Sequence, residues 1–511
     1  MALGLVVAAR LWVICGYPVG VDQGVFGWFG RIVADGGRPY VDAWDTKGPG
    51  VFALSGFVES VMPGPVGMRL FDIVLQLAAA CVLWRFPVCA PAPLTGLLAA
   101  SMYMAAYTTL GFHETAQPDS WANAILVMGL VPLLSAEIPL DSSLMRRRLF
   151  WACASVSVAV LFKPTYGALG AVPLAVLIAE TRRNADGLRE GALPRALVAP
   201  AMGFLAPLLL CAGWLASKGA LGAMWDVVIR WNSAVYAREG ASDLRHMAYS
   251  AVHAYFENLR WWPLALVSGV ALVGSLRARR APVVALWTAM VVVEIAAQRK
   301  FWGYHWTPLI GPLAVAVSNA ARDAVRDAVG HSIATSRMAI RHSLATVGAI
   351  GIALSMAAAV LWSERARLGE GRGTAASAMQ LLGYANRLSG FDDVVRVVRR
   401  DTKPSDRVYF WGTLAIGNYL TDRATVGRLA VSRPLLDGAG TAVNAEYRAE
   451  FWRAWQVKPP AMVVAYSATH CERYPELEWT CLEAFPELGL VLGREYRRPM
   501  ELGGFVVYYR R

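Results

Sequence analysis

The chain has 511 residues, of which 56% are hydrophobic and only 17% are charged, and its mean hydropathy is +0.40. A soluble globular protein carries roughly 25% charged residues, so this composition excludes a set of ordinary soluble domains. The formal net charge is +12. In a soluble chain this excess would indicate a nucleic-acid partner, but membrane proteins collect Lys and Arg in their cytoplasmic loops. We therefore expect a protein of the lipid bilayer that binds no nucleic acid.

Apolar runs of about 15 to 20 residues recur through the first part of the chain and predict a polytopic α-helical membrane protein. The first run lacks the basic segment and the cleavage site of a signal peptide, so it is expected to remain as a helix. About eleven transmembrane helices are expected, at 3–17, 66–85, 91–110, 120–140, 149–162, 165–180, 196–216, 261–276, 282–298, 307–320 and 343–363.

Arginine is distributed unequally between the loops that join these helices. One set of loops is short and basic, with Arg85, Arg146–Arg148 and Arg182 among its members. The positive-inside rule places this set in the cytoplasm, and an odd number of helices then places the N-terminus inside and the C-terminus outside. The chain is thus expected in the cytoplasmic (inner) membrane, with long outer loops at 18–65 and 217–260. Residues 321–342 are expected to form a basic amphipathic helix on the inner leaflet.

The composition becomes that of a soluble protein after the last apolar run. We expect a transmembrane domain over 1–363 and an extracytoplasmic α/β domain over 364–511. Helical patterns at 374–400, 442–456 and 476–486 alternate there with short strands at 407–411, 461–466 and 504–509. Cys471 and Cys481 are the two cysteines of this domain. A disulfide is permitted outside the cytoplasm, two free thiols are the alternative, and the spacing is unlike that of a zinc site.

The first outer loop concentrates charged residues beside the membrane. Asp22 follows the first expected helix, and a carboxylate at this boundary is a functional candidate unless it only caps a helix. Lys47 lies between Asp45 and a Gly-Pro-Gly turn. Its ammonium is suited to hold a lipid phosphate, and an ordinary ion pair with Asp45 or Asp42 is the alternative.

The stretch DQGVFGWFGRIVADGGRPYVDAWDTKGPGVF resembles the first extracytoplasmic loop of GT-C-type glycosyltransferases, which include protein O-mannosyltransferases and lipid A aminoarabinose transferases. The positions that match are Asp22, the stretch 36–42 with Tyr40 and Asp42, and then Asp45, Lys47 and Pro49. Two positions depart from the pattern. Gln23 stands where a second acidic residue is common, and Gly48 stands where proline is common. The first departure weakens any case for a metal held by paired carboxylates. No cofactor is certain, and a divalent metal is possible but not supported.

The resemblance extends more weakly to later loops. GFHETAQPDSWAN, LFKPTYGAL and QRKFWGYHWTPLIGPLA supply the further candidates Glu114, Asp119, Lys163, Arg299, Lys300 and His305. Arg299 and Lys300 could instead be ordinary boundary residues that contact lipid phosphates, and His305 an interfacial aromatic residue.

These features predict transfer of a sugar on the outer face of the membrane. The resemblance implies a polyprenyl-phosphate-linked donor and an acceptor hydroxyl on a glycolipid, a polysaccharide or a protein. Asp22 is expected to act as general base, and Lys47 to hold the donor phosphate with help from the later cations. Glu114 or Asp119 is expected to position the acceptor or to stabilise oxocarbenium charge. A transporter or flippase of a lipid-linked saccharide and an inactive scaffold are the alternatives.

Overall fold

The computed structural model describes residues 20–86, 93–109, 115–135, 142–183, 192–238, 281–316, 390–473, 480–497 and 499–511, together with Arg245 and Ala248. The expected helices 3–17, 261–276 and 343–363 and the amphipathic segment 321–342 lie outside these residues. The chain divides into two compact units. One, the helical unit, contains residues 70–213 and 240–365; the other, the mixed unit, contains residues 14–69, 214–239 and 366–511.

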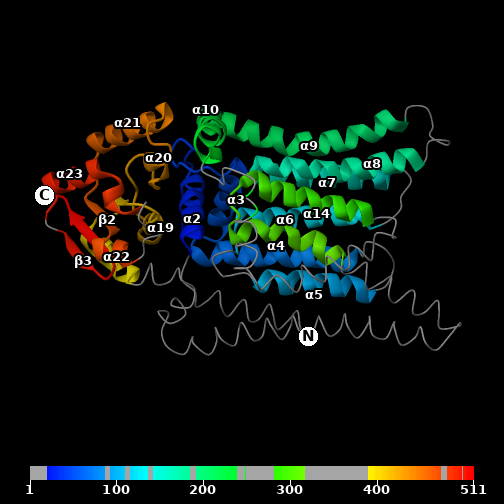
Figure 1. The fold of residues 1–511 in the computed structure, drawn as a ribbon, viewed down its shortest axis with the longest axis horizontal. Helices are drawn as coiled ribbons and strands as arrows, with labels where there is room; N and C mark the ends of the chain where they lie inside the picture. The colour runs from blue at the N-terminus through cyan, green and yellow to red at the C-terminus, as the bar shows by residue number, and fades with distance from the viewer. Residues whose placement is uncertain are drawn as a thin grey trace. The chain divides into compact units, whose positions relative to one another are not determined.

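The helical unit is built from apolar helices whose axes run side by side in Figure 1. Proline opens α6, where a missing backbone N–H costs nothing, and Ser142 caps α7 by accepting a hydrogen bond from the Met145 amide at 3.1 Å. The helices are α4 (Pro65–Arg85), α5 (Pro93–Thr109), α6 (Pro118–Leu134), α7 (Ser143–Phe162), α8 (Ala171–Arg183), α9 (Ala192–Ser217) and α14 (Ala281–Gln298), with the 3₁₀ turns η2 (Pro164–Gly170) and η6 (Gly303–Leu309).

Most of these helices fall where the apolar runs predicted them. The run 165–180 is an exception, because Pro164 interrupts the helix and the chain makes the turn η2 before α8. The run 307–320 likewise begins inside the turn η6 rather than in a helix. Among the described helices, Pro65–Arg85 and Leu197–Ser217 are long and apolar enough to span a membrane, whereas Pro49–Val61, Pro118–Leu134 and Pro282–Gln298 are apolar but shorter. The number of spans therefore stays a prediction.

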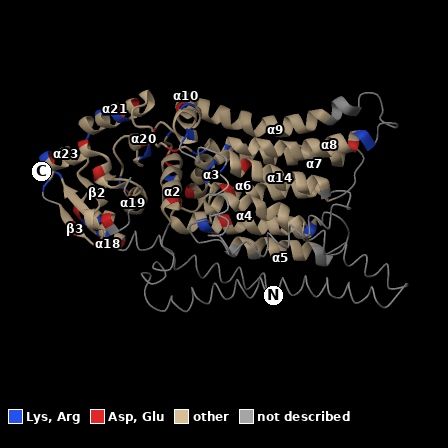
Figure 2. Ribbon diagram, viewed as in Figure 1, with Lys and Arg blue, Asp and Glu red and all other residues tan. Residues whose placement is uncertain are grey.

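Arginine residues lie at one end of the helical unit: Figure 2 shows basic positions at the end of α8, where Arg182 and Arg183 form the last turn, and most of the length of these helices is uncharged. The guanidinium carbons of Arg85 and Arg148 lie 5.6 and 5.8 Å from the ring centre of Phe86. Arg148 also donates to the Pro132 carbonyl, in the last turn of α6, at 2.7 Å. Residues from two of the short basic loops thus meet at one end of the bundle, the end at which α4 and α6 finish and α7 begins.

The first long loop of the sequence, in the mixed unit, is largely helical. α2 (Val21–Ala34) and α3 (Pro49–Val61) pack closely against each other. Gly30 makes this approach possible, because a Cβ atom there would lie 2.5 Å from the Ser55 carbonyl oxygen. The second loop supplies α10 (Leu221–Met224), the π-helical turn η3 (Trp225–Trp231), α11 (Asn232–Ala234) and η4 (Tyr236–Arg238).

A four-stranded mixed sheet forms the core of the C-terminal part of this unit. The order is β1-β2-β4-β3, with β1 parallel to β2 and the other two pairs antiparallel. The strands are β1 (Val408–Phe410), β2 (Met462–Tyr466), β3 (Met500–Leu502) and β4 (Phe505–Tyr509). Around them lie α18 (Phe391–Asp401), α19 (Ile416–Thr421), α20 (Arg433–Leu436), α21 (Ala442–Val457), α22 (Ala468–Arg473), η9 (Leu482–Ala484) and α23 (Pro486–Glu495).

The three predicted strands coincide with β1, β2 and β4. The predicted helix 476–486 is described only from residue 480, and there it was wrong, because residues 480–485 form no α-helix. The helix there is α23, which begins at Pro486 because proline favours the first helical position. The prediction missed β3, a three-residue strand that none of the apolar patterns marks. The first part of the predicted helix 374–400 lies outside the described residues.

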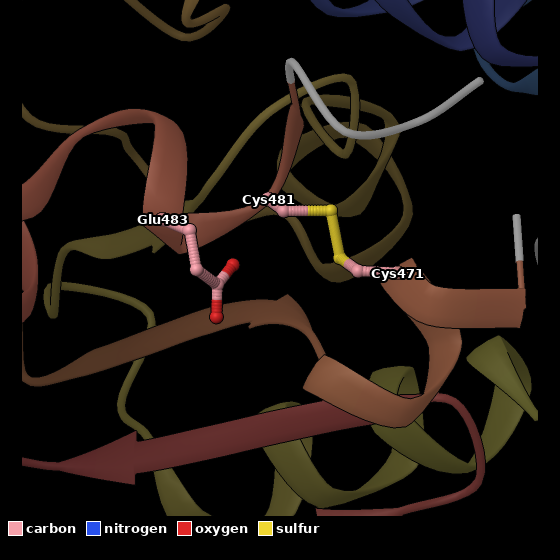
Figure 3. Close-up of side chains that lie close together, drawn as sticks. All are labelled: Cys471, Cys481 and Glu483. Carbon is pink, nitrogen blue, oxygen red and sulfur yellow. A yellow bond between two sulfur atoms is a disulfide. The ribbon is translucent and has the colours of Figure 1, made fainter. Parts of the chain in front are cut away.

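A disulfide links Cys471 and Cys481, whose Cα atoms are 6.2 Å apart (Figure 3). Glu483 lies beside them, and these three side chains are the one group of potential metal ligands gathered in the described residues. Because the two sulfur atoms are bonded to each other, neither thiolate is available to a metal.

Candidate functional site

Asp22 lies in the first turn of α2, in the mixed unit. The N-cap of this helix is Gly20, whose amide donates to Gln23 Oε1 at 3.3 Å. The interpretation of Asp22 as the helix N-cap was therefore wrong. Its carboxylate is half-buried and lies where the helix N-terminus favours negative charge. It interacts electrostatically with Asp45 and Lys47, so the acid and the cation of the first loop share one environment.

The turn between α2 and α3 is fixed by Tyr40. This buried residue has a φ of +62°, in the left-handed region, which a side chain of this size adopts only when contacts hold it there. Its hydroxyl donates to the Lys47 carbonyl at 2.8 Å, and its ring lies 4.5 Å from that of Phe52. Its own carbonyl accepts from Arg428 Nη1 at 2.8 Å. Tyr40 thus holds the backbone of Lys47 in place.

Asp42 has a structural partner on the surface of the same turn. Its carboxylate accepts from the Arg38 amide at 2.7 Å and from two guanidinium nitrogens at 3.0 and 3.2 Å. These hydrogen bonds hold the pKa of Asp42 below its usual range. The alternative that Asp42 pairs with Lys47 is not what the structure shows, because Arg38 occupies that role.

Asp45 and Lys47 form a buried but loose pair just before α3, which starts at Pro49. Asp45 Oδ1 accepts from the Lys47 amide at 2.8 Å, whereas the ammonium nitrogen stands 3.9 Å away. The same nitrogen lies 5.9 Å from the ring centre of Phe26. In the part of the chain that the structure describes, no acceptor lies within hydrogen-bonding distance of this ammonium. Asp45 therefore fixes the backbone of Lys47, while the N–H donors of the Lys47 ammonium remain available for a ligand.

Burial and neighbouring charges shift the pKa values of Asp45 and Lys47 in opposite directions. Burial raises the pKa of Asp45, and the attraction of Lys47 offsets only part of that rise. For Lys47, burial lowers the pKa, but the nearby Asp45, Tyr236 and Asp22 raise it by more. Lys47 consequently stays cationic at neutral pH, as a phosphate-binding residue must.

Two further segments of the mixed unit meet this loop. Asn232 Nδ2 donates to the Thr46 carbonyl at 3.1 Å, and the rings of Trp44 and Trp231 make an edge-to-face contact at 5.0 Å. From the C-terminal segment, the Arg428 carbonyl accepts from the Trp44 amide at 2.9 Å. Residues of the second long loop and of the C-terminal segment thus support the backbone around Lys47.

Tyr236 and Arg433 complete this cluster and were missed by the sequence analysis. The guanidinium carbon of Arg433 lies 5.2 Å from the ring centre of Tyr236, and its Nε donates to Asp437 at 2.7 Å. Both residues act electrostatically on Lys47, and Arg433 also acts on Asp45. Neither has a sequence signal of its own, because their proximity to the first loop arises only from folding.

The helical unit holds a second carboxylate–lysine pair, Asp119 and Lys163. Asp119 lies in the first turn of α6 and is completely buried, and Lys163 follows the last residue of α7. The ammonium donates to both carboxylate oxygens of Asp119, at 2.7 and 2.8 Å, and to Gln298 Oε1 at 2.8 Å. Tyr166 donates to Asp119 Oδ1 at 2.8 Å. Three contacts use the three N–H donors of a lysine, so Lys163 is fully engaged.

Through Gln298, this pair belongs to a hydrogen-bond network at the end of α14. Gln298 Nε2 donates to Glu294 Oε1 at 2.6 Å, and Thr165 Oγ1 donates to the same oxygen at 2.7 Å. Glu294 was not predicted from the sequence as a site residue. A signal existed, because an ionisable residue within an apolar helix is a functional candidate by default.

The remaining candidates are spread around this region. Arg299 follows α14 with a φ of +56° and an exposed side chain, and Lys300 is half-buried. His305 is buried in η6, with its ring 4.7 Å from that of Tyr304 and 5.3 Å from that of Trp302. His305 thus packs in an aromatic cluster. Glu114 lies outside the described residues.

Two structures of ArnT from Cupriavidus metallidurans resemble this chain along nearly its whole length. The apo structure gives a TM-score of 0.62 at 17% sequence identity, and the structure bound to undecaprenyl phosphate gives 0.58 at 16%. Each comparison covers 99% of this chain and 97% of the ArnT chain. This chain has the fold of ArnT. This likeness agrees with the fold that the resemblance of the first loop implied.

Other comparisons are weaker. The oligosaccharyltransferase of Archaeoglobus fulgidus gives a TM-score of 0.49 at 13% identity, over 100% of this chain and 73% of that one, a likeness too distant to support a conclusion. No protein-family model and no curated protein sequence match the chain. The ArnT likeness, at this identity, establishes the fold and leaves the activity to be argued from the site.

Proposed function

We propose that this chain is a membrane glycosyltransferase that moves a sugar from a polyprenyl-phosphate donor to an acceptor hydroxyl. The observation that carries the proposal is the cluster of Asp22, Asp45 and Lys47, held by Tyr40 on an ArnT-like fold. One of the two ArnT structures binds undecaprenyl phosphate, a ligand of the class that Lys47 is suited to hold.

The reaction needs one base and one cation. The acceptor oxygen attacks the anomeric carbon, and its proton passes to the Asp22 carboxylate. The bond from that carbon to the phosphate oxygen breaks, and its electron pair leaves with the polyprenyl phosphate. Lys47 stabilises the charge that develops on this phosphate, so the leaving group needs no proton. A single displacement inverts the anomeric centre.

The Asp119–Lys163 pair bears on the role of Asp119 in the transfer. Asp119 is the further acidic residue that the resemblance implies, and its place at the start of α6 is fixed by Lys163. We assign Asp119 to the positioning of the acceptor or to the balance of charge at the anomeric carbon. Lys163 then serves Asp119 rather than the phosphate, because its three donors are already engaged.

The orientation of the chain remains part of the proposal. The arginine-rich end of the helical unit would face the cytoplasm, and the end that carries Asp119 and Lys163 would face outward. The disulfide between Cys471 and Cys481 supports an extracytoplasmic C-terminal domain, because such bonds persist in oxidising compartments. We propose the cytoplasmic membrane as its location, and a glycolipid, polysaccharide or protein as acceptor.

The test is transfer by purified protein in liposomes. A panel of radiolabelled undecaprenyl-phosphate sugars would be offered with an extract of cell-envelope acceptors. Asp22→Asn should lower the transfer rate about 10²–10⁴-fold, the usual contribution of a general base, and should leave binding of undecaprenyl phosphate intact. Asp35→Asn is the matched control, since Asp35 is an exposed carboxylate at the other end of α2. Movement of the labelled lipid without bond cleavage would support a transporter instead, and a normal rate in Asp22→Asn would remove Asp22 from the base role.

A further inference from the structure

A buried polar network ties three helices of the helical unit together. Asp72 of α4 is only 3% exposed, and its Oδ2 accepts from the Tyr107 hydroxyl of α5 at 2.5 Å. Its Oδ1 accepts from Gln76 at 3.2 Å and lies 3.4 Å from the Ser120 hydroxyl of α6, whose proton has the Gln117 carbonyl as a second acceptor at 2.8 Å. A carboxylate in an apolar helix is costly unless donors surround it, and such residues are rare without a purpose. These donors come from α4, α5 and α6 and converge on one side chain.

The network also binds the backbone on both sides of Asp119. Gln76 Nε2 also donates to the Ser120 carbonyl at 3.1 Å, on one side of Asp119. On the other side, the Tyr107 hydroxyl accepts from the Ala116 amide at 3.2 Å. Ala116 has a φ of +53°, a left-handed conformation that a non-glycine residue keeps only when its surroundings impose it. The backbone before and after Asp119 is therefore fastened to the same group of side chains.

The network reaches further along α6. The Tyr103 hydroxyl donates to Gln76 Oε1 at 2.6 Å and accepts from Asn123 Nδ2 at 3.1 Å. The side chain of Asp119 takes no part in these bonds, because Lys163 and Tyr166 hold it. The backbone and the side chain of Asp119 are thus fixed by two separate sets of partners.

We propose that Asp72, acting through Tyr107, Gln76 and Ser120, is a positioning residue that sets the place of Asp119 during glycosyl transfer. This inference rests on the proposed function, since it takes Asp119 to serve that reaction. Asp72 contacts neither donor nor acceptor in this scheme. Its effect is to keep the first turn of α6 from shifting, and a shift of about 1 Å at a reacting group can lower a rate about 100-fold.

The experiment compares Tyr107→Phe and Asp72→Asn with the wild type in liposomes, with radiolabelled undecaprenyl-phosphate sugar as the probe. Each variant should lower kcat about tenfold or more and leave KM for the donor unchanged, because donor binding does not depend on α6 in this proposal. Hydrogen exchange gives a second readout that needs no activity. The amides of residues 116–123 should exchange faster in both variants. Tyr107→Phe removes a single oxygen atom and serves alone if Asp72→Asn fails to fold.

Arg148→Gln is the matched control, because Arg148 fastens the opposite end of α6 through the Pro132 carbonyl. This variant should speed exchange near Pro132 and leave kcat unchanged. Normal kcat and normal exchange in Tyr107→Phe would overturn the inference, as would an equal loss of kcat in Arg148→Gln. A wild type that transfers no sugar refutes the proposed function instead, and the exchange experiment still decides whether Asp72 holds the start of α6.

Discussion

The helical unit and the mixed unit each contain an aspartate–lysine pair. In Asp119–Lys163 the two side chains are in close contact, whereas in Asp45–Lys47 they are not. Lys163 contacts both oxygens of Asp119 at 2.7 and 2.8 Å, and Gln298 takes its third donor. The Lys47 ammonium nitrogen lies 3.9 Å from Asp45 Oδ1. That oxygen instead accepts a short hydrogen bond from the Lys47 backbone amide.

The difference shows how one ion pair can be structural and another available for a ligand. A lysine with all three donors engaged stabilises its partner and has nothing left for a phosphate. A lysine whose backbone is fixed and whose ammonium is only loosely paired is placed in advance for an anion, and this lowers the cost of binding.

Lys163→Met should destabilise the protein by about 3–5 kcal/mol, because it leaves the completely buried Asp119 without its cation. Thermal unfolding in detergent measures this loss. The double variant Lys163→Met with Asp119→Asn should recover much of the stability, since no buried charge then remains. A stability of Lys163→Met close to that of the wild type would show that the pair is not the tight contact described above.

Lys47→Met should weaken binding of undecaprenyl phosphate about 10–100-fold, the range expected when one charge-assisted hydrogen bond to a phosphate is lost. Its stability should fall by less than that of Lys163→Met, because Asp45 keeps its short hydrogen bond to the amide of residue 47 and loses only an ammonium 3.9 Å away. Equilibrium binding of the labelled lipid measures the affinity. Lys218→Met is the control, since Lys218 is a lysine of the same unit that donates to the Gly36 carbonyl at 3.0 Å. Equal losses in both variants would mean that Lys47 contributes only general positive charge.

Asp45→Asn should remove a pH dependence that the wild type shows. The folded-state pKa of Asp45 is raised by burial, so its contribution to stability is present below the unfolded value of about 3.9 and is lost as pH rises through the folded value. As pH falls through that raised pKa, Asp45 gains a proton and its attraction for Lys47 disappears. Binding of undecaprenyl phosphate by the wild type should therefore tighten on acidification, and Asp45→Asn should bind tightly throughout. A pH profile shared by the two proteins would assign the dependence to another group.

Arg38→Ala should change stability by less than about 1 kcal/mol, because its pair with Asp42 is exposed and screened by solvent. The hydrogen bonds from Arg38 keep the pKa of Asp42 below its usual range. The contribution of Asp42 is therefore present above its unfolded pKa and lost as pH falls through the folded value. Thermal unfolding of wild type and variant at neutral and acidic pH measures both effects. A large loss at neutral pH would show that this surface pair holds the turn around Lys47.

The sequence was sufficient for features that depend on neighbouring residues. Apolar runs located α4, α5, α9 and α14, and alternating short strands located β1, β2 and β4. The order of Asp22, Asp45 and Lys47 in one loop predicted a GT-C fold, and the chain has the fold of ArnT. Local pattern failed where proline decided the boundary, as at η2 before α8 and at the start of α23.

Partners that are distant in the chain could not be predicted in this way. Asp119 and Lys163 are 44 positions apart, and Lys163 and Gln298 are 135 positions apart. Tyr236 and Arg433 reach the environment of Lys47 from segments that carry no motif. Such contacts depend on how helices and loops pack, and a single sequence records only which side chains are available.

The sequence by itself determined the class of the protein and the kinds of group in its site: an apolar helical chain, a first loop with acids and a lysine, and an arginine bias between loops. These follow from composition, periodicity and spacing, which are properties of neighbouring residues. Only the tertiary structure decided which lysine is engaged and which can hold an anion. That distinction depends on distances of 2.7 Å in one pair and 3.9 Å in the other, which only the folded chain sets.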